Sequence, residues 1–354
     1  MPTLDDVANL SGVSAMTVSR VVNNKPGVSA KTIARVEAAI RQLNYRPNLV
    51  ARSLVTNRIN SIGVLFSRLE NPLYSVMVSG IIQTASRYDL DVVLVNGHDV
   101  ASLIQSANTL ISKQIDGLIV LPVEISAKGM EASHSTTVEF YQELEQILTT
   151  MPVHSLPTIL LEETVINGIS GRVRVNYRGG AEMAVDHFVQ NGHSRIGMVC
   201  HHVKDAGIWG ERYHGFMQAM EKHGLAVCEN YIDSCSLSVS SGYEAGMRLF
   251  SQQDRPTALY CANDEIAVGI LHAAAACGLH VPEDISIIGH DGSLYSQISY
   301  PKLTTVSIRP YEMGRMCMEQ LYQALNGAAI APVYTIEPVL LEGDSVKDLS
   351  SAQS

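Results

Sequence analysis

The chain reads Gly12-Val13-Ser14-Ala15-Met16-Thr17-Val18-Ser19-Arg20-Val21-Val22-Asn23 from residue 12 to residue 23, and this segment specifies the architecture of the N-terminal region. Gly12 and Ser14 predict a tight turn followed by the capped start of a helix over residues 15–22. Thr3 and Asp6 have capping-box spacing, which predicts an earlier helix over about residues 4–10. Ser29 caps a third predicted helix with apolar residues at helical spacing. This arrangement is typical of a helix-turn-helix, whose second helix enters the major groove of DNA.

The outward side of the second predicted helix carries side chains that suit DNA. Hydroxyl groups can contact phosphate, and the fork of Arg20 matches O6 and N7 of guanine. The alternative to a DNA-binding helix-turn-helix is a short helical hairpin whose basic side chains are merely solvated. The outward positions are Ala15, Met16, Thr17, Ser19 and Arg20. The expected core comprises Val7, Ala8, Val13, Val18, Val21, Ile33, Val36, Ile40 and Leu43.

The charge is divided unevenly along the chain. Of the 25 basic and 35 acidic residues in the 354-residue chain, residues 1–60 hold eight bases and three acids, a net charge of +5. The remaining 17 bases and 32 acids give residues 61–354 a net charge of −15. A basic head on an acidic body indicates a polyanion-binding module joined to a second function. We expect domains at residues 1–46 and 61–342, a linker at 47–60 and a polar tail at 343–354.

The linker contains a short helical segment. Pro47 ends the third predicted helix, and Asn48 can cap a new one. About seven residues cannot form a stable helix alone in water, so we expect this hinge helix to fold on DNA. Ala51 and Leu54 could then enter the minor groove and wedge a base step.

The body alternates short apolar runs with segments of helical length. This pattern predicts an α/β fold with parallel sheets, and its length favours two lobes, with a ligand at the carboxyl ends of the strands. We expect the first lobe at 61–174 plus 309–327 and the second at 175–308 plus 328–342. The predicted strands are Ile62–Phe66, Val92–Val95, Leu118–Leu121, Ile159–Leu161, Ile196–Val199, Ala258–Tyr260 and Ile285–Ile288.

Motifs throughout the chain resemble the LacI/GalR family of bacterial repressors. In the head they include Leu4-x-Asp6-Val7-Ala8, Gly12-Val13-Ser14-x-x-Thr17-Val18-Ser19-Arg20 and Asn44-Tyr45-x-Pro47-Asn48. In the body they include Asn71-Pro72-Leu73-Tyr74, Asn191-Gly192-His193, Ala262-Asn263-Asp264, Gly289-x-Asp291 and Leu303-Thr304-Thr305-Val306. The resemblance implies a periplasmic-binding-protein-like body of two lobes behind the helix-turn-helix head and hinge helix.

The resemblance also implies two sets of site residues. In the family, the positions of Ala15, Met16 and Arg20 contact bases, and a sugar or related molecule binds between the lobes. The implied DNA-binding set is Thr3, Ser14, Ala15, Met16, Thr17, Ser19, Arg20, Asn23, Ser29, Thr32, Tyr45, Asn48, Ala51 and Leu54. The implied effector-binding set is Leu73, Tyr74, Glu162, Arg212, Asn263 and Asp291.

The effector set has the chemistry to bind a sugar. Asp, Arg and Asn side chains can grip neighbouring hydroxyls, and Tyr74, Trp209 or Tyr213 could stack on a pyranose. Each residue has a structural alternative: Asn263 and Asp264 could cap a helix starting at Glu265, Arg212 could lie on the surface of a helix over 210–223, and Trp209 could fill the core. Three features depart from the family. The stretch of residues 123–157 is longer than usual, and residues 126–135 look like an added loop. Glu162 stands where relatives usually have Asp, and Gly292 stands where a second Asp commonly follows the position of Asp291.

Other function classes find little support. No nucleophile lies in a known catalytic motif, and no phosphate-binding glycine motif or zinc spacing is present, so we expect neither catalysis nor a metal or cofactor. Six cysteines without C-x-x-C spacing, no membrane-length apolar run and an acidic N-terminus indicate a cytoplasmic protein. An enzyme on this fold would not need residues 1–58, and a sugar-transport protein would not need a basic head.

We therefore expect a transcriptional regulator, a repressor, that binds palindromic operator DNA as a homodimer. It would be nucleoid-associated when bound to its operator. A sugar inducer between the lobes would weaken operator binding, and a purine-type corepressor is the alternative. Sugar-processing or sugar-binding without a DNA role is the remaining alternative.

Overall fold

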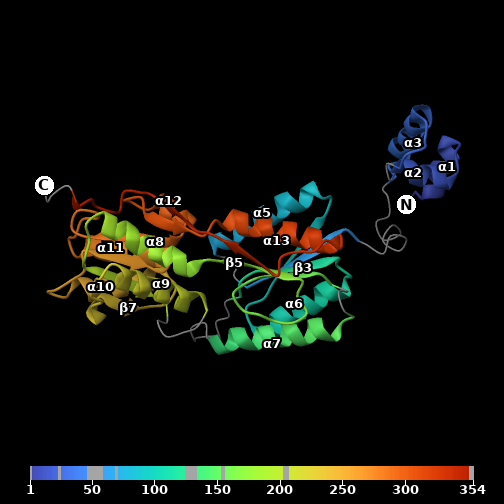
Figure 1. Ribbon diagram of the computed structural model, residues 1–354. Coiled ribbons are helices and arrows are strands. Elements are labelled where there is room, and N and C mark those ends of the chain that lie inside the picture. The colour runs from blue at the N-terminus through green and yellow to red at the C-terminus, as the bar shows by residue number, and fades with distance from the viewer. Residues whose placement is uncertain are drawn as a thin grey trace. The chain divides into compact units, whose positions relative to one another are not determined.

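The computed structural model of this chain describes residues 2–22, 25–45, 59–67, 71–123, 134–152, 156–201 and 207–350. The chain forms two compact units, Met1–Ile59 and Asn60–Ser354 (Figure 1). The DNA contacts expected at Asn23, Asn48, Ala51 and Leu54, and the expected hinge helix, lie outside the described residues. No helix in the described parts of the chain is long and apolar enough to cross a membrane.

The first unit, the head, contains three helices that the sequence predicts closely. They are α1 (Leu4–Ser11), α2 (Ala15–Val22) and α3 (Ala30–Leu43). The Thr3 and Asp6 side chains form the expected capping box, and Gly12 ends α1 in the left-handed conformation that favours glycine. Ser14 Oγ accepts a hydrogen bond from the backbone of Thr17 at 3.2 Å, and Ser29 caps α3 in the same way.

The three helices enclose a small apolar core. Its buried residues are Val7, Ala8, Val18, Val36, Ala39 and Tyr45. Partly buried Val13, Val21, Ile40 and Leu43 pack against them. The helix-turn-helix fold expected from residues 12–23 is therefore present.

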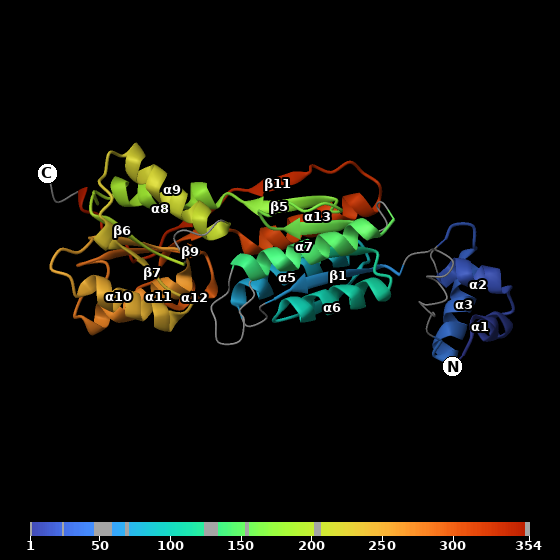
Figure 2. The ribbon, with the colours of Figure 1, turned by 90° about the horizontal axis from the view of Figure 1, so that it is seen from below.

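The second unit contains two six-stranded sheets, each with helices on both faces (Figure 2). All strand pairs in the first sheet are parallel, in the order β11-β5-β4-β3-β1-β2. Its strands are β1 (Ser61–Phe66), β2 (Asp91–Asn96), β3 (Gly117–Val120), β4 (Thr158–Leu161), β5 (Gly171–Val175) and β11 (Val333–Ile336). Its helices are α5 (Pro72–Arg87), α6 (Val100–Ser112), α7 (His134–Thr150) and α13 (Pro310–Leu325). We call this sheet and its helices the first lobe.

The second sheet has the order β12-β10-β9-β8-β6-β7 and is parallel except where β10 pairs with β12. Its strands are β6 (Ile196–Cys200), β7 (Ile232–Ser234), β8 (Ala258–Cys261), β9 (Ser286–Asp291), β10 (Thr304–Ser307) and β12 (Val339–Leu341). Its helices are α8 (Tyr177–Gln190), α9 (Ile208–Lys222), the 3₁₀ turn η1 (Glu229–Tyr231), α10 (Val239–Phe250), α11 (Asp264–Ala276) and α12 (Leu294–Ile298). This is the second lobe.

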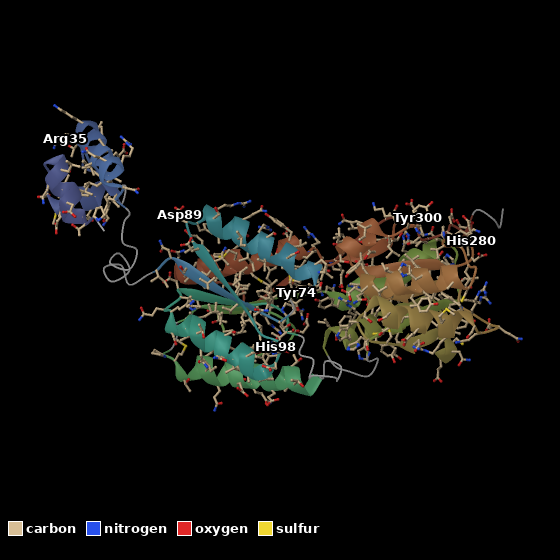
Figure 3. All side chains as sticks on the ribbon, turned by 180° about the vertical axis from the view of Figure 1, so that it is seen from behind. Arg35, Tyr74, Asp89, His98, His280 and Tyr300 are labelled. Atoms are coloured by element: carbon tan, nitrogen blue, oxygen red, sulfur yellow. The ribbon has the colours of Figure 1, made fainter. Side chains whose placement is uncertain are left out.

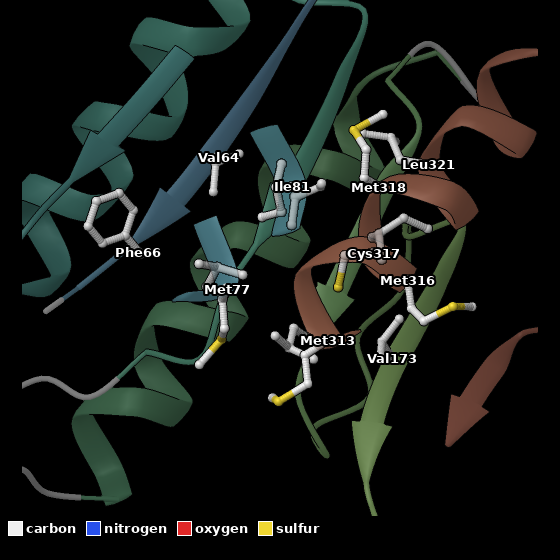
Figure 4. Packing of buried hydrophobic residues seen from close by; sticks show 14 of the residues in the cluster. Val64, Phe66, Met77, Ile81, Val173, Met313, Met316, Cys317, Met318 and Leu321 are labelled. Atoms are coloured by element: carbon white, nitrogen blue, oxygen red, sulfur yellow. The ribbon is translucent and has the colours of Figure 1, made fainter. Parts of the chain in front are cut away.

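Close helix packing builds the core of the first lobe on the side of α5 and α13. Methionines and Cys317 of α13 belong to one buried cluster with Val64, Phe66 and Val173 of the sheet (Figure 4). At Gly80 and Gly314 a Cβ atom would strike backbone of the opposite helix, so glycine permits this approach. Residues of α6 and α7, including Phe140 and Leu144, form the core on the other face. Within the long stretch 123–157, residues 134–150 form α7, and most of the added loop expected at 126–135 lies outside the described residues.

All seven apolar runs in the body form strands, but the sequence analysis missed β5, β7, β10, β11 and β12. Arg172 and Arg174 interrupt β5, and β10 is a buried polar strand, so neither reads as an apolar run. The expected lobe boundary at residue 328 is wrong. Strand β11 pairs with β5 and therefore belongs to the first lobe. The chain crosses to the second lobe after β11, because β12 pairs with β10.

The segment after β12 also differs from the expected polar tail. Ser345 is fully buried, its backbone carbonyl accepts from Ile287 N at 2.8 Å, and its hydroxyl donates to the Ile287 carbonyl at 2.6 Å. The carbonyl of Lys347 lies 3.1 Å from Nε2 of buried His193. Residues here pair with backbone groups near the start of β9, an inner strand of the second sheet, so at least residues 343–350 belong to the second lobe.

Candidate functional site

A cavity of about 40 Å³ lies between the two lobes. It is formed at the carboxyl ends of several strands, where parallel sheets commonly bind ligands. The first lobe contributes Asn71, Leu73, Tyr74, Met77, Pro122, Ile308 and Met313. The second contributes Tyr177, Ile208, Trp209, Arg212, Leu237, Asn263, Glu265 and Asp291. Five of the six residues expected to bind an effector therefore line one cavity.

Arg212 is the most deeply buried polar residue of this cleft. Only 1% of its surface is exposed, although it comes from the middle of α9. Its Nη2 donates to Asp291 Oδ1 at 2.7 Å, and its Nη1 donates to the carbonyl of Ala262. Burial opposes the charge on the guanidinium, but Asp291 and its other neighbours outweigh that effect and raise its pKa. The alternative of an ordinary surface arginine is wrong.

Asp291 lies at the end of β9 in an unusual backbone conformation, with a φ of 104°. The turn that follows is held by Asp264, which is almost fully buried at the start of α11. The carboxylate of Asp264 accepts from Ser293 N at 2.7 Å, from Ser293 Oγ at 2.8 Å and from Thr305 Oγ1 at 2.6 Å. Burial, reinforced by the charge of Asp291, raises the pKa of Asp264 to about 7.

Other expected effector residues have structural duties as well. Asn263 caps α11 through a 2.8 Å bond from Ile266 N, yet it also lines the cavity. Tyr74 lies at the end of the first lobe nearest the second (Figure 3), and its hydroxyl donates to the carbonyl of Pro122 at 2.7 Å. Glu162 lines a smaller adjoining cavity, where its carboxylate accepts from Tyr141 at 3.2 Å.

The aromatic residues of the cleft are only partly those expected. Trp209 lines the cavity and is partly buried, whereas Tyr213 does not line it and packs with the second-lobe core instead. Residue 213 follows Arg212 by about 100° around the helix, which turns it away from the cleft. The sequence analysis did not include Tyr177 in the cleft. This residue comes just after β5, and β5 was not predicted because its sequence is not an apolar run.

In the head, most of the expected DNA-binding residues are accessible. Thr3, Ser14, Met16, Arg20 and Ser29 are exposed, and Ala15, Thr17, Ser19 and Thr32 are partly exposed. Met16 is 75% exposed, which is unusual for a large apolar side chain. Tyr45 differs from the others because its ring is 9% exposed and belongs to the head core.

Comparison with known proteins assigns the family. Residues 3–48 match the family described as bacterial regulatory proteins, lacI family, and residues 185–346 match the periplasmic binding protein-like domain. The chain is 31% identical over 345 residues to the HTH-type transcriptional regulator RegA of Clostridium saccharobutylicum, covering 97% of this chain and 98% of that one. It is 30% identical over 347 residues to the ribose operon repressor of Escherichia coli K12, covering 98% and 100%. The chain belongs to the lacI family.

Solved structures agree with this assignment. The Lac repressor dimer bound to operator and the anti-inducer ONPF has a TM-score of 0.80 to this chain at 27% identity, covering 98% of this chain and 99% of that one. A lacI-family chain is a DNA-binding transcriptional regulator with a ligand-binding body, and not an enzyme. Among the described residues, no group of His, Cys, Asp and Glu side chains could hold a metal ion.

Proposed function

We propose that this chain is a cytoplasmic repressor that binds a palindromic operator as a homodimer and releases it when a sugar binds between the lobes. In this proposal residues 1–46 contact DNA, residues 47–60 form the hinge, and the cleft of the remaining chain holds the inducer. A ligand can shift operator affinity only through different affinities for two lobe arrangements. The names of the ribose operon repressor and the Lac repressor support a sugar-responsive operon as the target.

The head supports the DNA part of this proposal. Helix α2 exposes Met16 and Arg20, and Ser14 is exposed just before it, while Val18 anchors the opposite side in the core. A helix presented in this way can lie in the major groove with Arg20 donating to a guanine. Of the expected base-contacting positions, Met16 and Arg20 are exposed, whereas Ala15 is only partly exposed and packs against the head core.

The Arg212–Asp291 pair is the observation that carries the effector part. The guanidinium of Arg212 is buried and the carboxylate of Asp291 is partly buried between the lobes, where an ion pair contributes little to stability and marks a candidate binding site. Nε of Arg212 is also buried and has no hydrogen-bond partner among the described residues. A hydroxyl oxygen of a sugar could accept from Nε while other hydroxyls donate to Asp291.

One face of the second unit supports the homodimer. Helices α5 and α12 lie on the same side of it in Figures 1 and 2. Exposed large apolar side chains lie on these two helices and just after α12: Val76, Ile82, Leu294, Ile298 and Tyr300, the last 98% exposed. Neighbouring exposed apolar residues typically mark a protein–protein interface.

The test is an operator titration with and without a panel of D-ribose, D-galactose, D-glucose, cellobiose and free purine bases. We expect one sugar to weaken operator binding by the wild-type chain, and Asp291→Asn to raise its midpoint at least about thirtyfold, because losing one member of a buried charged pair costs about 2–5 kcal/mol. Asp254→Asn, which removes the exposed partner of Arg195, is the matched control and should respond normally.

Each outcome of this titration decides something. If Asp291→Asn responds with the wild-type midpoint, the cleft assignment is wrong. If a purine base strengthens operator binding, the chain is a corepressor-dependent repressor, a possibility kept open by its 30% identity to the PurR repressor of Photobacterium profundum. If no member of the panel changes wild-type binding, the proposed sugar inducer fails.

A further inference from the structure

Tyr177 occupies the place where the chain first crosses between the lobes. It follows β5 of the first lobe by two residues and is the first residue of α8 in the second lobe. Its ring is 7% exposed and is part of the first-lobe core, together with Tyr74 and Met313. The residue therefore begins a second-lobe helix while its side chain is embedded in the first lobe.

The same ring also contacts two buried residues of the second lobe. The Cζ atom of Arg212 lies over the Tyr177 ring, 4.8 Å from its centre. The centre of the His290 ring is 6.3 Å from that of Tyr177. His290 is fully buried, and its Nδ1 is 2.7 Å from the hydroxyl of Tyr260. Tyr177 is thus a direct link between the first-lobe core and the interior of the second lobe.

Trp209 provides a second aromatic contact for Arg212. The Cζ atom of Arg212 also lies over the Trp209 ring, 4.8 Å from its centre. A buried guanidinium over two rings gains an electrostatic attraction that increases when water is excluded. The hydrogen bonds to Ala262 and Asp291 fix two nitrogens of Arg212, and the two rings fix the position of the guanidinium.

We propose that Tyr177 is a positioning residue that couples the lobe arrangement to Arg212, and through it to the effector. The proposal rests on the effector site argued above. When the lobes move, the Tyr177 ring follows the first-lobe core while Arg212 stays with α9. Their separation would loosen the guanidinium and weaken its contacts with a bound ligand. Arg212 is then correctly placed only in one lobe arrangement, which gives an effector different affinities for the two arrangements.

Two substitutions of Tyr177 distinguish the effect of its aromatic face from the effect of its apolar packing. Tyr177→Phe keeps the aromatic face, so its effector midpoint should change less than that of Tyr177→Leu. Tyr177→Leu keeps an apolar side chain in the first-lobe core but removes the π face, and we expect it to raise the midpoint about tenfold. The readout is the operator titration, with the sugar that acts on the wild-type chain. Tyr231→Leu, a buried tyrosine of the second lobe outside the cleft, controls for lost packing.

A second readout needs no effector. Trp209 is the only tryptophan of the chain, so tryptophan fluorescence reports on its surroundings alone, which include Arg212 and His201. In the free full-length protein, Tyr177→Leu should change its emission maximum and increase its quenching by acrylamide, while Tyr177→Phe and Tyr231→Leu should leave both unchanged. This measurement tests the coupling even if no sugar affects wild-type operator binding, the result that would defeat the proposed function.

The proposal is overturned by any of three results. One is a Tyr177→Leu chain whose Trp209 fluorescence and effector midpoint both equal those of the wild type. Another is an equal change in Tyr177→Phe and Tyr177→Leu, which would transfer the role from the ring face to the hydroxyl. A change in Tyr231→Leu as large as that in Tyr177→Leu would reduce the effect to lost packing and also defeat the proposal.

Discussion

The two lobes contribute different chemistry to the same cleft. The charged residues that line the main cavity, Arg212, Glu265 and Asp291, all come from the second lobe. The first lobe contributes mainly apolar and aromatic surface, including Leu73, Tyr74 and Met77. For the proposed effector site, we infer from this difference that the second lobe determines how tightly a polar ligand is held, while the first lobe covers the ligand. Variants of the second lobe should therefore have the larger effects.

The largest effect is expected for Arg212→Met, which leaves Asp291 without its cationic partner. Breaking a buried ion pair typically destabilises a protein by about 3–5 kcal/mol, whereas replacing both charges can be nearly neutral. We expect urea unfolding to show a loss in this range for Arg212→Met and a smaller loss for Arg212→Met combined with Asp291→Asn. Equal stability of the single and double variants would show that the pair does not couple these residues, and the division of roles between the lobes would weaken.

A smaller effect, also in the second lobe, concerns pH. The pKa of Asp264 is raised to about 7 from a model-compound value of 3.8, so the native state binds a proton that the unfolded state loses near pH 4. Its contribution to stability is fully present below about pH 4 and is lost as pH rises through about 7. Asp264→Asn cannot lose this proton. The stability of the variant relative to the wild type should thus rise with pH, by at most about 1.4 kcal/mol per pH unit.

Chemical denaturation of both proteins at several pH values between 4 and 8 measures this difference. Comparing the two chains cancels other titrating groups such as His193 and His290, whose pKa values burial lowers. A constant difference across the range would mean that Asp264 remains charged throughout. Asp284→Asn is a suitable control, because its exposed carboxylate has a pKa lowered by hydrogen bonds from His280.

The head could be predicted from sequence almost to the residue because its signals are local. The Thr3–Asp6 capping box, the Ser14 and Ser29 caps and the Gly12 turn each act within a few residues of the chain. In the body the same approach found the apolar strands but not β11, whose place is set by β5 more than 150 residues earlier. A pairing partner that distant leaves no mark in a short window of sequence.

The candidate site divides in the same way. Resemblance to a family supplied Arg212, Asn263 and Asp291, which meet in one cavity. Neither resemblance nor pattern indicated Asp264 as the anchor of the Asp291 turn, or Tyr177 as a contact of Arg212. Both roles depend on contacts between segments that are distant in the sequence, so they can be seen only in the folded structure. Such contacts are the part of a site that sequence spacing cannot supply.

The smallest effect is expected in the first lobe, for Tyr74→Phe. This substitution removes the hydroxyl that donates to Pro122 at 2.7 Å and keeps the ring in the core. The loss of one such bond costs about 1 kcal/mol of stability, with the Pro122 carbonyl left to find another donor. If the first lobe only covers the ligand, the effector midpoint should change less than about threefold, compared with at least thirtyfold for Asp291→Asn. Operator titration with the active sugar measures both. A loss of response in Tyr74→Phe as large as that in Asp291→Asn would show that the first lobe also grips the ligand through polar contacts.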